Sequence, residues 1–404
     1  MNIAEIQDGG VTSAKGFLAG AVYAGIKKKA KDVLDLSLLY SESPCVAAGT
    51  FTTNKIKAAP VILDQQNIEK HGKARAVLIN SGCANACTGE QGMANAEATA
   101  KKVSEVLRIP VEEVMVASTG VIGVQLPVDK MLEGISKIKL TREGGQNLTR
   151  AIMTTDTRPK KMAVKVQVDK TEFIIGGTAK GAGMIHPNMA TMLGFLTTDA
   201  AVDQGFLHQA LLSAIESSFN LVSVDGDTST NDTVLLLANG QAGNQTIVKG
   251  TLEAEAFQKG LDQVCQYLAK SIARDGEGAT RLIEIVVNGA LNSEDARLAA
   301  RTIACSPLVK AAVHGCDPNW GRIIAAAGRS GAAVVQEKSD VYIGEMGLLK
   351  SGMPLAFDKK AASALLNREE VLLRVDLNLG SASARAWGCD LSEEYVVINS
   401  EYTT

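Results

Sequence analysis

Near its middle the chain reads Lys180-Gly-Ala-Gly-Met-Ile-His-Pro-Asn-Met-Ala-Thr-Met-Leu193. Its two glycines allow the backbone to approach a ligand or a neighbouring strand closely, because glycine has no Cβ. Pro187 and Asn188 predict a turn, and Ala190 places a small residue directly before the hydroxyl of Thr191. Taken alone, the pattern indicates a glycine-rich turn that leads into an apolar segment, with Thr191 as an ordinary strand hydroxyl.

On both sides of this stretch, strand-like and helix-like patterns alternate. Short apolar runs bounded by Gly, Ser or charged residues predict strands, and apolar residues at four-three-four spacing predict helices. The predicted strands are residues 17–26, 33–40, 76–79, 114–117, 163–168, 172–175, 233–237, 283–287, 371–377 and 395–398, and the predicted helices are residues 90–107, 207–219 and 293–304. This mixture predicts an α/β (α+β) fold in which helices cover sheets. A break at residues 288–292 predicts a main domain of residues 1–288 and a smaller C-terminal domain of residues 289–404.

The composition is that of a compact globular protein. With 404 residues, 46% of them hydrophobic, the chain can bury a large core. A net charge of −3 and an aromatic content of 4% argue against nucleic-acid binding, which needs a basic field or stacking side chains. No signal peptide and no run of 18 apolar residues is visible. Seven scattered cysteines are typical of reduced thiols, so we expect a cytoplasmic protein without membrane partners.

Several familiar catalytic motifs are missing from the sequence. It has no phosphate loop, no GxGxxG after a strand, no GxSxG and no HExxH, and its histidines number four. Cys83 and Cys87 lack the second ligand pair of a zinc site, and the acidic stretch 225–232 lacks the final glutamate of a calcium loop. We therefore expect neither a metal nor a cofactor. One remaining source of a general base is a threonine whose own α-amine becomes free when the chain is cut before it.

Seven further stretches, distributed along essentially the full chain, complete the pattern. They are Gly49-Thr-Phe-Thr-Thr-Asn54, Asn80-Ser-Gly-Cys-Ala-Asn-Ala-Cys-Thr-Gly89, Ser118-Thr-Gly-Val-Ile-Gly123, Met153-Thr-Thr-Asp-Thr157, Asp225-Gly-Asp-Thr-Ser-Thr-Asn-Asp232, Asp275-Gly-Glu-Gly-Ala-Thr280 and Asp317-Pro-Asn-Trp-Gly-Arg322. Together with residues 180–193, these stretches resemble the ornithine acetyltransferase family, the glutamate N-acetyltransferases of arginine biosynthesis. Within this resemblance, residues 180–193 correspond to the self-cleavage site.

The resemblance implies a precursor that cuts itself between Ala190 and Thr191, giving an α chain of residues 1–190 and a β chain of residues 191–404. Thr191 then becomes an N-terminal nucleophile. It takes the acetyl group of N2-acetylornithine as an ester and passes it to glutamate, which gives ornithine and N-acetylglutamate. A free α-amine has a reference pKa of about 7.7–8.0, which suits general-base work on the adjacent hydroxyl. The resemblance also implies stacked sheets sandwiched by helices, and a heterotetramer of two α and two β chains.

The resemblance assigns roles to further residues. The hydroxyl of Thr119 and the backbone N–H of Gly120 are implied as the oxyanion hole. The implied substrate-binding residues are Thr154, Thr155, Lys180, Thr191, Glu277, Asn399 and Thr404. Lys180 supplies a positive charge for the carboxylate of an amino-acid substrate, and Glu277 supplies a negative charge for an ammonium group. Which of Thr154 and Thr155 contacts the substrate stays open, although the spacing to Lys180 favours Thr154.

Three questions stay open on the sequence alone. One alternative is a self-processing N-terminal-nucleophile aminopeptidase, which shares the nucleophile but attacks peptide amides. The other alternative is an uncleaved, inactive relative that binds amino acids. The use of acetyl-CoA is also open, because an acyl-threonine ester can be loaded from a thioester as well as from an amide.

Overall fold

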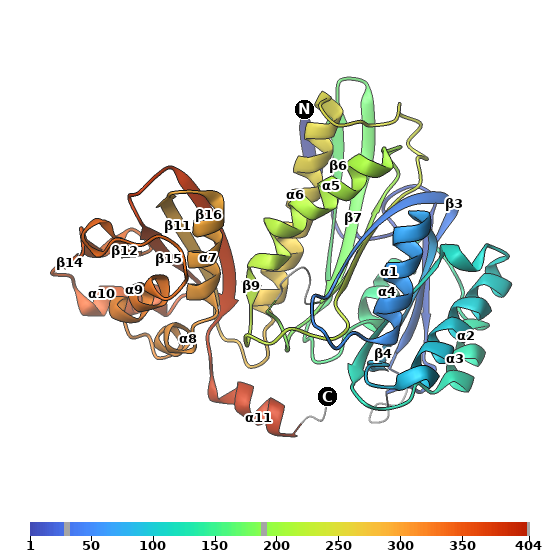
Figure 1. Cartoon of the computed structure of the whole chain (residues 1–404), viewed down its shortest axis with the longest axis horizontal. Helices are drawn as coiled ribbons and strands as arrows, with labels where there is room; N and C mark the ends of the chain where they lie inside the picture. The colour runs from blue at the N-terminus through green and yellow to red at the C-terminus, as the bar shows by residue number, and fades with distance from the viewer. Residues whose placement is uncertain (28–32, 187–191, 402–404) are drawn as a thin grey trace.

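The computed structural model describes residues 1–27, 33–186 and 192–401 (Figure 1). In this part of the chain the larger sheet has nine strands, in the order β1-β6-β7-β8-β10-β3-β4-β5, with β2 paired to β3. The strands are β1 (Asn2–Glu5), β2 (Phe17–Val22), β3 (Leu36–Phe51), β4 (Lys73–Cys83), β5 (Val114–Val121), β6 (Lys160–Val168), β7 (Thr171–Lys180), β8 (Leu193–Thr198) and β10 (Thr233–Ala238). The pairs β8–β10 and β4–β5 are parallel, and the other neighbours are antiparallel.

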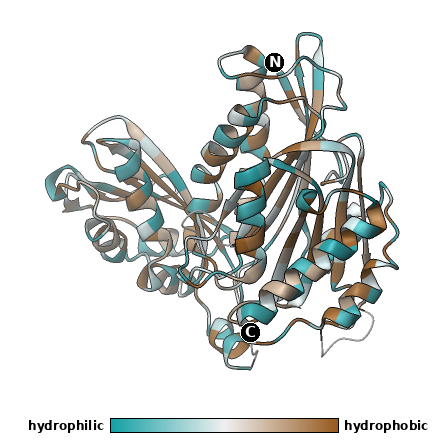
Figure 2. Ribbon diagram, turned by 45° about the vertical axis from the view of Figure 1, so that its right-hand side comes forward, coloured by the Kyte–Doolittle hydropathy of each residue, from teal (hydrophilic) through white to brown (hydrophobic). Residues whose placement is uncertain are grey.

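Side chains alternate between the two faces of this sheet, as the two-residue period of a strand requires. Val77 of β4 and Leu235 of β10 belong to an inner cluster that consists largely of strand side chains packed on one another. The outer face is covered by two groups of helices, one over β3–β5 and one over β3, β6 and β7. The helices of the larger unit are α1 (Ala59–His71), α2 (Gly89–Leu107), α3 (Val128–Ile135), α4 (Gly145–Ala151), α5 (Gln204–Glu216) and α6 (Leu252–Arg274). In Figure 2 the strands are largely brown, whereas the helices also carry hydrophilic teal.

A second, smaller unit lies to the left in Figure 1. Within the described residues its sheet has seven strands, in the order β14-β13-β12-β15-β11-β16-β9. They are β9 (Val222–Ser223), β11 (Leu282–Ala290), β12 (Asp340–Ile343), β13 (Met346–Lys350), β14 (Met353–Pro354), β15 (Glu370–Asp376) and β16 (Ala382–Cys389). Its helices are α7 (Ser293–Ala304), α8 (Pro307–His314), α9 (Trp320–Gly328) and α10 (Lys359–Leu366). Helix α6 contacts strands of both sheets and so joins the two units.

The two sheets and their covering helices confirm the predicted α/β (α+β) class with sheets sandwiched by helices. The predicted helices 90–107 and 293–304 are α2 and α7, whereas the predicted helix 207–219 ends earlier, at Glu216. The division of the chain into domains 1–288 and 289–404 stays a prediction, and β11 crosses that boundary. None of the helices that the described residues form is long and apolar enough to cross a membrane.

The prediction of a strand at residues 395–398 is wrong, because this segment lies inside helix α11 (Glu393–Glu401). Its Tyr-Val-Val-Ile sequence has the β-branched residues that favour strands. However, Glu393 and Glu394 precede it, and acidic residues stabilise the first turn of a helix. Val396 is 65% exposed, so the run is not part of a buried sheet.

Candidate active site

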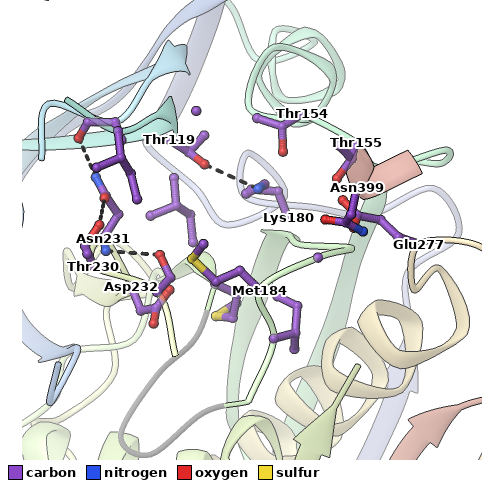
Figure 3. Close-up of a pocket in the computed structure, with 18 residues that line it drawn as sticks. Thr119, Thr154, Thr155, Lys180, Met184, Thr230, Asn231, Asp232, Glu277 and Asn399 are labelled. Carbon is purple, nitrogen blue, oxygen red and sulfur yellow. Dashed lines mark hydrogen bonds between the residues drawn. The ribbon is translucent and has the colours of Figure 1, made fainter. Parts of the chain in front are cut away.

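A cavity of about 100 Å³ lies where the ends of β5 and β7 meet the beginning of β8 and the loop before β10 (Figure 3). Every candidate residue that the structure describes lines it. They are Thr119, Gly120, Thr154, Thr155, Lys180, Glu277 and Asn399. Ala190, Thr191 and Thr404 lie outside the described residues, but Met192, which follows Thr191 in the sequence, also lines the cavity. The tertiary structure thus gathers candidate residues from distant parts of the chain around one small space.

Thr119 and Gly120 lie near the end of β5, where it runs parallel to β4. Gly120 has a φ of +130°, and a Cβ there would lie 2.4 Å from the backbone carbonyl carbon of Gly82. Only glycine therefore allows the two strands to approach this closely. The Nζ of Lys180 donates a hydrogen bond to Oγ1 of Thr119 over 3.3 Å. This bond brings a cation to the end of the strand that carries the predicted oxyanion hole.

Lys180 is the last residue of β7 and is only 8% exposed. Burial lowers the pKa of Lys180 below its ordinary value, the charge of Asp156 raises it in part, and the charge of Lys160 lowers it. A buried ammonium that keeps its charge needs anionic neighbours. The neighbourhood of Lys180 supplies them, and one of them, Asp156, was not recognised from the sequence.

Asp156 connects three segments around the cavity. Its Oδ1 accepts hydrogen bonds from Nζ of Lys160 (2.6 Å) and from the backbone N–H of Gly181 (2.7 Å), and its Oδ2 accepts from the backbone N–H of Thr154 (3.0 Å). Burial raises the pKa of Asp156, but the charges of Lys180 and Lys160 and the hydrogen bonds from Lys160 and Gly181 outweigh it and lower the pKa to about 2. Lys160 also binds Asp275 over 2.6 Å. Asp156 therefore holds both the Thr154 loop and the end of β7.

The C-terminal helix α11 lines the cavity on the side of Glu277. Asn399 of α11 donates through Nδ2 to Oε2 of Glu277 over 2.9 Å, and Ser392 donates to the carbonyl of Gly278 over 2.6 Å. A Cβ on Gly183 would lie 2.3 Å from a carboxylate oxygen of Glu277, so this glycine leaves the room that Glu277 occupies. The two glycines of the stretch 180–193 thus have different neighbours. The neighbour of Gly183 is Glu277, a candidate substrate-binding residue.

The acidic stretch 225–232 is built into the protein by its own hydrogen bonds. Asp225 accepts from the backbone N–H groups of Met184 (2.6 Å) and Ile185 (2.9 Å), and Asn231 donates to the carbonyls of Ala84 and Ser118. These bonds tie the stretch to the segments that follow β7 and β4 and to β5. Asp232, at its end, is a cavity residue that sequence reasoning missed.

The comparisons with known proteins agree with one another. The model of the ArgJ family matches residues 18–404. The arginine biosynthesis bifunctional protein ArgJ of Dehalococcoides mccartyi is 57% identical over 399 residues, which are 99% of this chain and 98% of that protein. The protein of the same name from Symbiobacterium thermophilum is 52% identical, with 98% of this chain and 99% of that protein covered. Among solved structures, the crystal structure of the Bacillus halodurans arginine biosynthesis bifunctional protein is 47% identical with a TM-score of 0.51, over 52% of this chain and all of that chain.

The mixed α/β fold, the polar cavity and these relatives define a biosynthetic enzyme. The match to the family model and the match to relatives aligned over nearly their whole length identify its family. The chain belongs to the ArgJ family, and with it to the enzymes of arginine biosynthesis.

Proposed function

We propose that this enzyme transfers the acetyl group of N2-acetylornithine to glutamate through an acetyl ester on Thr191, after cutting its own chain between Ala190 and Thr191. The observation that carries the proposal is the cavity itself. A hydroxyl, a buried lysine, a carboxylate and an amide from separate segments line a space that Met192, the covalent neighbour of Thr191, also lines. The name of the relatives, a bifunctional protein of arginine biosynthesis, supports a role in the same pathway.

Self-cleavage would begin with attack of the Thr191 hydroxyl on the carbonyl carbon of Ala190. The C–N bond between the two residues breaks, an ester forms on the threonine oxygen, and the nitrogen becomes a free α-amine. Water then attacks the ester, so that the chain 1–190 leaves with a new carboxylate and the hydroxyl of Thr191 is restored. The freed amine is the general base that the histidine-poor sequence otherwise lacks.

Acetyl transfer would use the same oxygen twice. The α-amine takes the hydroxyl proton while the oxygen attacks the acetyl carbonyl of N2-acetylornithine, and ornithine leaves after its nitrogen receives that proton. The α-amine of glutamate then attacks the acetyl ester, and N-acetylglutamate departs as the Thr191 oxygen regains a proton. Each step passes through a tetrahedral oxyanion, for which the hydroxyl of Thr119 and the N–H of Gly120 would be the donors.

The remaining cavity residues suit the substrates' charges. The ammonium of Lys180 would bind the α-carboxylate that both amino acids carry, because an unpaired carboxylate is costly in a buried site. The carboxylate of Glu277, steadied by Asn399, would bind an ammonium group. Ala84, Ile122 and Met192 give the cavity an apolar wall that fits the methyl of an acetyl group. Thr154 and Thr155 both line the cavity, so the choice between them stays open, and we extend substrate binding to Thr404 from the resemblance alone.

The assembly and the second donor complete the proposal. We infer that the α and β chains remain together as a heterotetramer of two of each. We further infer that acetyl-CoA is at best a second donor. If acetyl-CoA and glutamate give N-acetylglutamate as fast as N2-acetylornithine and glutamate do, the inference that N2-acetylornithine is the main acetyl donor is refuted.

The decisive experiment replaces Thr191. Thr191→Ala removes the oxygen, so we expect one uncut band on a denaturing gel and no acetyl transfer. Thr191→Ser keeps the oxygen but loses the methyl that restricts the rotamer, so cleavage and transfer should persist at reduced rates. A cut and active Thr191→Ala protein would refute the mechanism. Hydrolysis of peptide amides without acetyl transfer to glutamate would instead identify the aminopeptidase alternative, and an unmodified chain that stays uncut would identify the binding relative.

A further inference from the structure

Asp232 is a buried carboxylic acid in the cavity, and the contacts among the described residues satisfy its side chain only in part. Asp232 is 2% exposed and lines the cavity together with Lys180 and Met192. Among the described residues, its Oδ2 has no hydrogen-bond partner. A buried acceptor without a donor costs about 1–3 kcal/mol, and in a native structure a group of this kind calls for an explanation such as a catalytic role or a bound ion.

Hydrogen bonds fix the backbone on both sides of Asp232, so the side chain cannot readily move out to solvent. The carbonyl of Asp232 accepts from the N–H of Thr52 over 2.9 Å, and the N–H of Thr233 donates to the carbonyl of Met192 over 3.0 Å. Because β8 and β10 are parallel neighbours with Thr233 opposite Leu193, Asp232 lies next to the end of β8 that opens onto the cavity. The carboxyl is therefore presented to the space in which substrate is proposed to react.

Among the described residues, no cationic side chain is hydrogen-bonded to Oδ2 of Asp232. Burial raises the pKa of Asp232 well above its ordinary value, and hydrogen bonding with Ser229 and the charge of Lys180 offset this only in part. The other ionisable groups near the Lys180 side of the cavity are Glu277, Asp156, Lys160 and Lys27. Lys180 donates to Thr119 rather than to Asp232, and Glu277 already has Asn399 as its partner. Within the described residues, Oδ2 of Asp232 is thus left to accept a hydrogen bond from a cationic group outside this set.

We propose that Asp232 forms an ammonium-binding subsite in the cavity, distinct from Glu277. This inference rests on the proposed acetyl transfer, which supplies two sources of an ammonium group. One is the δ-ammonium of N2-acetylornithine, and the other is the α-ammonium that chain cleavage frees on Thr191. When either group binds, the carboxylate form of Asp232 accepts hydrogen bonds from the ammonium.

The test compares Asp232→Asn and Asp232→Ala with a matched control. Asp64→Asn is suitable because Asp64 is also buried, has a pKa raised by burial and, within the part of the chain that the structure describes, has one oxygen without a partner, but does not line the cavity. Each variant is checked for cleavage on a gel and for thermal unfolding. Transfer is then measured with N2-acetylornithine and with N2-acetylnorvaline, which has the same carbon chain without the δ-amine, across a range of pH.

Two results would support the subsite and would distinguish the sources. If the δ-ammonium binds, the KM for N2-acetylornithine rises by about tenfold or more, as for loss of a charged hydrogen bond, while that for N2-acetylnorvaline does not change. If the α-ammonium of Thr191 binds, kcat falls equally for both donors and the acidic limb of kcat/KM moves to lower pH. The limb moves this way because an amine that has lost a carboxylate partner gives up its proton more readily.

Other results would overturn the subsite. Unchanged kinetics would overturn it. An equal rise in the KM of both donors, with no change in the pH of the acidic limb of kcat/KM, would also overturn it, because that pattern means that Asp232 acts only through Lys180. An uncut chain, or misfolding of both variants while Asp64→Asn folds, would assign Asp232 to folding or cleavage. Calorimetric binding of ornithine against norvaline, and the pH dependence of chemical labelling of the terminal amine, require no transfer. These two measurements decide the role of Asp232 even if the unmodified enzyme fails to transfer acetyl and the proposed function is thereby refuted.

Discussion

Replacing Asp156 by asparagine tests whether its charge, rather than its shape, organises the active site. Asp156→Asn keeps the side-chain volume but turns one of the two oxygens into an N–H donor. The groups that face this carboxylate are all donors, namely Nζ of Lys160 and the backbone N–H groups of Gly181 and Thr154. One of these donors will therefore confront another donor, and Lys160 will retain Asp275 as its only carboxylate partner within 4 Å in the described structure.

The expected loss of stability can be estimated in two ways. Lowering the pKa of Asp156 from 3.8 to about 2 corresponds to about 2 kcal/mol of stability at neutral pH. Removing one partner of a buried ion pair typically costs about 3–5 kcal/mol. We therefore expect the free energy of unfolding to fall by about 2–5 kcal/mol. Because the folded-state pKa is depressed, this contribution is present above pH 3.8 and is lost as the pH falls towards 2, so the variant should lose less stability on acidification than the unmodified protein.

The effect on activity should be visible in the pH profile. Asp156 raises the pKa of Lys180, so Asp156→Asn will let Lys180 lose its proton at a lower pH. We expect the KM for both N2-acetylornithine and glutamate to rise by about 10- to 100-fold, which corresponds to the loss of one charged hydrogen bond. We also expect the alkaline limb of kcat/KM to move to lower pH.

The control for this experiment is Asp275→Asn. Asp275 binds the same Lys160 at the same distance as Asp156, but it does not bind Gly181 or Thr154. Both variants should be destabilised in urea unfolding, whereas only Asp156→Asn should move the alkaline limb. If the two variants have the same pH profile, or if Asp156→Asn leaves both KM values unchanged, the role assigned to Asp156 is wrong.

Three further substitutions probe individual contacts. Lys180→Ala should raise the KM for both amino-acid substrates, and unchanged steady-state kinetics would remove Lys180 from the binding site. Thr119→Val keeps the shape of the side chain but loses its hydroxyl, so kcat should fall by about 10²–10³ with little change in KM, as for loss of one oxyanion donor; a normal kcat would exclude that role. Gly183→Ala brings a Cβ within 2.3 Å of a Glu277 carboxylate oxygen, so calorimetry should show weaker binding of ornithine, and unaltered affinity would mean that Glu277 does not bind it.

Periodic patterns predicted the regular elements well where the element buries one face. Helix α7 has exactly the predicted range because its buried residues recur with helical spacing. The same reasoning failed for residues 395–398, where β-branched residues predicted a strand and the exposed helix α11 formed instead. A propensity for strand has no effect unless a neighbouring strand supplies hydrogen-bond partners, and strand neighbours are set by tertiary structure.

The sequence by itself determined the family and indicated the chemistry that we propose. Colinear stretches of glycine, threonine and charged residues indicated the candidate list, and the scarcity of histidine indicated a base other than imidazole. Only the tertiary structure decided which charges meet. Asp156, Asp232 and Asp275 stood within recognised stretches, yet Asp156 meets Gly181 across 25 residues of chain and Asp275 meets Lys160 across 115. Asp232 lines the cavity together with Lys180, which is also remote from it in the sequence. Electrostatic effects depend on distance and burial in three dimensions, and a linear sequence specifies neither of these before the chain has folded.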